Sequence, residues 1–132
     1  GVRGGVPTID NGIIVFETPA GQIAYYDISR GLYVLTPIVS HMESFSISNG
    51  IIAAAVAEDS YWGDMNGDGI IEGNTKVLVL YDIPTGRLVS TGVVVCCGPD
   101  ISSTGLIAYD GNDGCDHFYV MIDSIVRQYF GR

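Results

Sequence analysis

Short apolar runs recur along the chain and indicate β-strands. Residues 13–17, 51–58 and 106–109 are rich in Ile, Val and Ala, and each run follows an Asn-Gly or Thr-Gly pair. Apolar runs of this length, bounded by turn residues, are typical of strands, whereas helices need longer segments with a period of about 3.6 residues. The pattern therefore predicts an all-β protein.

The apolar runs belong to an internal repeat. Asn-Gly-Ile-Ile at 11–14 recurs at 49–52, and the looser Thr-Gly-Leu-Ile follows at 104–107. Tyr-Asp-Ile at 26–28 recurs at 81–83. Recurring segments of this kind are the sequence sign of an architecture built from stacked units. The chain is therefore expected to contain three copies of one supersecondary unit.

Each unit divides into four short predicted strands. The strands are 8–10, 13–17, 22–27 and 32–36 in the first unit, 44–48, 51–58, 76–82 and 87–94 in the second, and 100–103, 106–109, 118–123 and 125–130 in the third. Tandem four-stranded units are typical of β-propeller blades. We expect one domain, 1–132, with antiparallel blades at about 6–37, 43–95 and 98–131. Because propellers close with about four to eight blades, three blades predict half or part of a larger ring of about six to eight.

The second unit carries an insertion, 58–74, between its second and third strands. Within it, 64–72 reads Asp-Met-Asn-Gly-Asp-Gly-Ile-Ile-Glu, which alternates oxygen-bearing side chains with small residues and suits a hard cation such as Ca²⁺. An EF-hand needs Glu at the twelfth loop position, but Thr75 stands there, and strands rather than helices flank the loop. A calcium loop outside the EF-hand class is therefore predicted, with an acidic turn that holds no metal as the alternative.

The pattern Asp-x-Asn-x-Asp-Gly-x-x-Glu resembles the calcium loops of integrin-type and related β-propeller blades. The resemblance implies that Ca²⁺ is bound by the side chains of Asp64, Asn66, Asp68 and Glu72 and by the carbonyl oxygen of Ile70. The third unit, with Ser-Thr-Gly-Leu-Ile-Ala-Tyr at 103–109, resembles a TolB-type blade. The middle unit is similar to the calcium-loop blades of secreted archaeal and bacterial propellers, so the resemblance covers nearly the whole chain.

Charge and hydropathy narrow the class of partner. The chain has 6 basic and 15 acidic residues, a net charge of −9, which disfavours nucleic acid and anionic membranes. No apolar run reaches the length that spans a bilayer, so no membrane insertion is expected. No secretory signal is visible, as is also true of a processed chain, and an extracellular or cell-surface location is expected.

A second group of reactive residues comprises Cys96, Cys97, Cys115 and His117. The spacing of these four soft ligands is unlike that of common zinc sites. A disulfide from Cys115 to Cys96 or to Cys97 is the alternative in an extracellular protein, and it leaves one thiol over. Buried, reduced cysteines are equally compatible with the sequence.

The remaining candidate chemistry concerns binding. Tyr61 and Trp62 precede the predicted calcium loop and either contact a protein or carbohydrate ligand or cover the apolar base of the loop.

Ser40 precedes His41, but no Gly-x-Ser-x-Gly elbow exists, so we expect no enzyme. The sequence predicts an interaction or assembly module whose ring is completed by a second copy or by further blades. The alternatives are part of a propeller-fold hydrolase or lyase, and a subunit of a surface filament.

Overall fold

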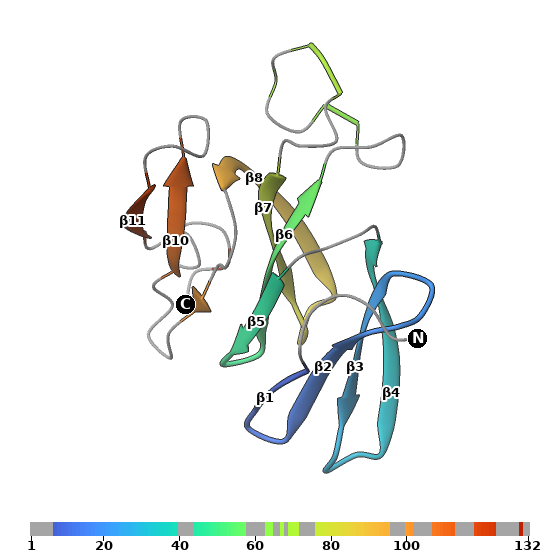
Figure 1. The fold of residues 1–132 in the computed structure, drawn as a ribbon. Coiled ribbons are helices and arrows are strands. Elements are labelled where there is room, and N and C mark those ends of the chain that lie inside the picture. Colours follow the sequence, from blue (N-terminus) through green and yellow to red (C-terminus); the bar gives the residue numbers. More distant parts are fainter. Residues whose placement is uncertain are drawn as a thin grey trace.

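Strands and tight turns form the protein, which confirms the predicted all-β class. The structure is a computed structural model, and it describes residues 7–39, 44–57, 63–64, 67, 69–71, 76–95, 100–101, 107–112, 118–123 and 130. The strands lie in three separate sheets (Figure 1). Each sheet is formed by a continuous stretch of the chain.

The first two sheets are four-stranded antiparallel meanders. The first contains β1 (Thr8–Asp10), β2 (Ile13–Glu17), β3 (Gln22–Asp27) and β4 (Leu32–Val39). The second contains β5 (Ser44–Ser48), β6 (Ile51–Ala57), β7 (Lys76–Asp82) and β8 (Arg87–Val95). The third sheet, in the order β11-β10-β9, contains β9 (Asp100–Ile101), β10 (Ile107–Asn112) and β11 (Phe118–Asp123).

Six strands, namely β1, β2, β3, β5, β7 and β11, begin and end at the predicted residues. β4 continues to Val39 and β10 to Asn112, beyond the predicted ends at residues 36 and 109. The strand predicted at 125–130 lies outside the described residues apart from Phe130. Three four-stranded blades and their arrangement in a propeller therefore stay a prediction.

Asn-Gly turns join the first and second strands of the first two sheets. Asn11 and Gly12 have φ of 49° and 80°, and Asn49 and Gly50 have φ of 51° and 78°. Positive φ at both central residues is the signature of a two-residue hairpin turn whose twist matches that of the strands. Asn and Gly are the residues that tolerate this backbone at least cost, and so the repeated pair fixes the register of both hairpins.

The second sheet is buried on both faces. Alternate residues of β6 and β7 point to opposite sides, because side chains along a strand alternate. One set packs on the first sheet: Ile52, Ala54, Val56, Val79 and Tyr81 meet Val15, Ile23, Tyr25 and Ile38. The other set faces the third sheet: Ile51, Ala53, Ala55, Leu78 and Leu80 cluster with Val95 and Ile101. This double burial explains why 51–57 is continuously apolar, without polar alternation.

The repeat also extends to single hydrogen bonds. The Thr36 hydroxyl donates to the carbonyl of Ile23 at 2.8 Å and accepts from the amide two residues later in β4 at 3.2 Å. The Thr91 hydroxyl makes the same pair of bonds, to the carbonyl of Leu78 at 2.8 Å and from the amide two residues later in β8 at 3.1 Å. In both sheets, the hydroxyl bonds to the residue at which the third and fourth strands shift register. The first two sheets are therefore two copies of one structural unit.

The first strands of the sheets lie next to one another. β1 contacts β5, and β5 contacts β9. A hydrogen bond joins the first two sheets at this point, since the amide of Asn49 donates to Oδ2 of Asp10 at 2.8 Å. The sheets therefore stack in chain order, with the second between the other two.

Candidate functional site

The first sheet has an apolar face that points away from the second sheet. Val15 and Tyr25 point toward the second sheet, so their neighbours in β2 and β3 point the other way. Strand register places residues of β1 and β4 on the same side. This surface, which we call the outer face, comprises Ile9, Ile14, Phe16, Tyr26, Tyr33 and Leu35.

Several of these apolar side chains are exposed. The exposed fraction is 61% for Ile9, 53% for Tyr33, 50% for Leu35 and 38% for Tyr26. The rings of Phe16 and Tyr33 approach each other at a centroid distance of 6.0 Å and an interplanar angle of 42°. A shallow hollow of about 470 Å³ lies over this pair, and it is lined by Pro7, Ile14, Phe16, Glu17, Thr18, Pro19 and Tyr33. Contiguous apolar surface of this kind is a common mark of an interaction site.

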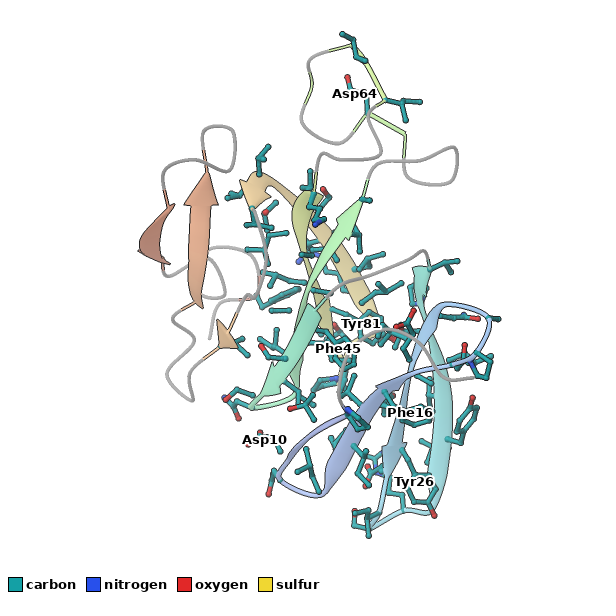
Figure 2. All side chains as sticks on the ribbon, viewed as in Figure 1. Asp10, Phe16, Tyr26, Phe45, Asp64 and Tyr81 are labelled. Carbon is teal, nitrogen blue, oxygen red and sulfur yellow. The ribbon has the colours of Figure 1, made fainter. Side chains whose placement is uncertain are left out.

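A comparison of the two equivalent tyrosines shows that no described sheet covers the outer face. Tyr26 and Tyr81 hold the same place in the repeat, and the hydroxyl of each lies over the glycine of the following turn, Gly31 or Gly86. Tyr26 is 38% exposed, whereas Tyr81 is 6% exposed because the first sheet covers it. Figure 2 shows Tyr81 and Phe45 close to the first sheet and Tyr26 on the first sheet itself. The outer face is thus the counterpart of a face that is buried under another sheet.

The groove between the first two sheets is a further hollow, of about 200 Å³, and its groups have a structural role. Asp27 lies in it and is used by its own turn: Oδ1 accepts hydrogen bonds from the amide and hydroxyl of Ser29, and Oδ2 lies 3.5 Å from Nε of Arg30. Burial, followed by the neighbouring Tyr81, raises the pKa of the Tyr25 phenol above its ordinary value of 10.0. Asp27, Ser29 and Arg30 therefore hold the β3–β4 turn in place.

The Asp64 loop lies beyond the ends of β6 and β7 (Figure 2). The carboxylate of Asp64 accepts hydrogen bonds from the amides of Gly67 at 3.0 Å and Gly69 at 2.6 Å. Gly63, Gly67 and Gly69 have φ of 75°, 81° and 83°, a backbone that favours glycine. The chain therefore curls around the Asp64 carboxylate, and Ile70, the predicted carbonyl ligand, follows directly. The described part of the loop is thus held by hydrogen bonds to Asp64.

The other residues predicted for binding or redox chemistry lie outside the described residues. They are Asn66, Asp68 and Glu72 of the calcium loop, the aromatic residues Tyr61 and Trp62, and the group Cys96, Cys97, Cys115 and His117. Within the described ranges, no three His, Cys, Asp or Glu side chains form a metal-binding group. Calcium binding, the disulfide and the aromatic contact stay predictions.

The outer face itself was not predicted. Its signal in the sequence is the run Ile-Ile-Val-Phe at 13–16, where residues on both faces of β2 are apolar. Such a run is typical of a strand that is covered on both sides. In the structure one side of β2 is covered by the second sheet and the other is the outer face.

Known proteins give this chain no family. No protein-family model matches it, and no curated protein matches it significantly. Among solved structures, the chain is similar to the crystal structure of the computationally designed Ika4 protein, over 93% of this chain and 92% of that chain, with 14% sequence identity and a TM-score of 0.37. A likeness of this size assigns neither fold nor function. No helix in the described part of the chain is long and apolar enough to cross a membrane.

Proposed function

We propose that the chain is a non-enzymatic, calcium-stabilised β-propeller segment of an extracellular or cell-surface protein, and that it works as an interaction or assembly module through its outer face. The observation that carries the proposal is the exposure of Tyr26 where its equivalent, Tyr81, is buried under a sheet. The stacking of three sheets in chain order and the contacts of β5 with β1 and β9 support the propeller arrangement.

The energy available at the outer face is of the same order as the cost of association. Covering a four-stranded face of roughly 330 Å², with strands about 4.8 Å apart and about five residues long, contributes about 8 kcal/mol at roughly 25 cal/mol per Å². Association costs about 4–15 kcal/mol in lost translational and rotational freedom and in side-chain ordering. The two terms are comparable, so net association needs a partner that covers the outer face fully, as an additional sheet would.

The Asp64 loop has a structural part in this proposal. Bound calcium supplies positive charge within an acidic segment of a chain whose net charge is −9. Asp64 holds the curl of the loop through Gly67 and Gly69. Ordering the long 58–74 insertion costs backbone entropy, and a cation held by oxygen ligands offsets that cost.

Thermal unfolding tests the calcium part of the proposal. At calcium about 100-fold above Kd, binding stabilises the folded state by about 3 kcal/mol. For a domain of this size the melting temperature should then rise by about 10 °C relative to excess chelator. Asp64→Ala should remove this calcium response, whereas the control Asp10→Asn, which keeps an oxygen acceptor for the amide of Asn49, should retain it. Equal melting temperatures in calcium and in chelator would refute calcium stabilisation.

A further inference from the structure

The outer face also points to a particular occupant. We infer, on the basis of the proposed function, that it packs against the third sheet of a second copy of this chain, and that two copies join head to tail into a closed pair. The inference goes beyond a general interaction surface, because it names the partner, the sheet that the partner contributes and the number of copies.

The internal packing of the chain is directional. The second sheet meets the first through Ile52, Val79 and Tyr81, and it meets the third through the opposite side chains of the same strands. Each contact between neighbouring sheets therefore joins two different faces. The sheet that comes earlier in the chain contributes one kind of face, such as the Val15 and Tyr25 face, and the sheet that comes later contributes the other, such as the Val79 and Tyr81 face. Tyr81 lies on the face of the second sheet that the first sheet covers, and Tyr26, its equivalent, lies on the outer face. The outer face is therefore of the kind that a sheet earlier in the repeat covers.

The third unit is the part of the chain that can act as this earlier sheet. Its sequence continues the repeat, since Thr-Gly-Leu-Ile at 104–107 corresponds to Asn-Gly-Ile-Ile at 49–52. Its described strands, β9 to β11, lie beside the second sheet, and no further described sheet lies beyond them. The first and third sheets thus stand at opposite ends of the stack. Among the described strands, those of the first sheet and those of the third are not in close contact, because the second sheet lies between them (Figure 1).

The size of the face favours a closed pair over a single contact. A sheet of four strands, about 4.8 Å apart and about five residues long, presents roughly 330 Å² in projection. A stable interface buries about 800 Å² per partner. One contact buries less than this area per partner. A closed pair contains two such contacts, and together they bury an area comparable with that of a stable interface. Head-to-tail contacts that close give a ring, and those that do not close give a filament.

Sedimentation of the full chain over a range of concentrations in calcium chloride tests the inference. The wild type should sediment as a species of twice 14.1 kDa. Leu35→Lys, a change at a half-exposed position of the outer face, should shift it to the monomer. The matched control is Val94→Lys, at an exposed apolar position on the edge strand β8 of the second sheet, and it should remain a pair. Circular dichroism of both variants checks that each one folds.

Each other outcome is informative. A pair that survives Leu35→Lys would overturn the inferred contact, and a ladder of larger species would overturn closure. If the wild type is a monomer, binding of an environment-sensitive apolar dye separates the two proposals. Dye binding that Leu35→Lys reduces would reject the second copy while retaining the interaction surface. A monomer whose dye binding is unchanged by Leu35→Lys would reject both the second copy and the interaction surface.

Discussion

Replacing Thr36 with valine removes one hydroxyl and leaves the side-chain volume nearly unchanged. That hydroxyl donates to the carbonyl of Ile23 and accepts from the amide of Ile38, and Thr36 is 1% exposed. Water cannot replace the lost bonds at a buried site, so a carbonyl and an amide lose a partner. The same change at Thr91 removes the same two bonds at a half-buried site, where water can reach the freed groups.

The expected loss in the free energy of unfolding differs between Thr36→Val and Thr91→Val only because Thr36 is buried and Thr91 is half-buried. Each buried group left without a partner costs about 1–3 kcal/mol, and two groups are affected, so Thr36→Val should lower the free energy of unfolding by about 2–6 kcal/mol. Thr91→Val should cost about 1 kcal/mol, near the net value of an ordinary hydrogen bond. For a domain of this length the larger loss corresponds to a fall in melting temperature of roughly 10 °C.

Urea denaturation followed by tryptophan fluorescence and by circular dichroism measures both losses. Thr36→Ser is the control, because it keeps the hydroxyl and removes one methyl group, which costs about 0.8 kcal/mol. Equal losses for Thr36→Val and Thr91→Val would refute the reasoning from burial. A negligible loss for both would show that the repeated hydrogen bonds do not stabilise the register shift.

Two further predictions concern the core. Leu80→Ala should lower the free energy of unfolding by about 2–5 kcal/mol, because Leu80 is fully buried between the second and third sheets. Leu35→Ala should change it by less than about 1 kcal/mol in the monomer, because Leu35 is half-exposed. Chemical denaturation compares the two variants, and similar losses would contradict the assigned burial. The raised pKa of Tyr25 means that the folded state holds this proton more tightly than the unfolded state, so stability should be unaffected by this group below pH 10.0 and should fall as the pH rises above that value. Tyr25→Phe should make that fall smaller in urea titrations at alkaline pH, and an identical fall in both proteins would contradict the assignment.

Local sequence signals were sufficient to predict most of the described strands. Asn-Gly at 11–12 and 49–50 marks two hairpin turns, and the apolar runs after them give β2 and β6 with nearly their observed bounds. These features depend on backbone geometry within a few residues, which is why the sequence contains them. The extension of β4 to Val39 was missed because it depends on the register shift that Thr36 serves, and a register shift leaves no composition signal.

The candidate sites divide in the same way. The sequence predicted a calcium loop at 64–72, and calcium binding stays a prediction; what the structure describes there is the hydrogen bonds from the amides of Gly67 and Gly69 to the Asp64 carboxylate. The outer face was beyond the reach of the pattern, because Ile14 and Ile52 are the same residue type at the same repeat position, although one faces outward and the other is fully buried. Whether a strand face is covered depends on the neighbouring sheet, which only the tertiary arrangement reveals.

The double burial of the second sheet bears on how the protein folds. β6 and β7 have no water-facing side of their own, so this sheet gains its full burial only when both neighbours are in place. A chain shortened at either end would present these strands as an apolar surface prone to aggregation. The three sheets are therefore expected to unfold together, in one cooperative transition whose weakest contact sets the stability of the whole stack.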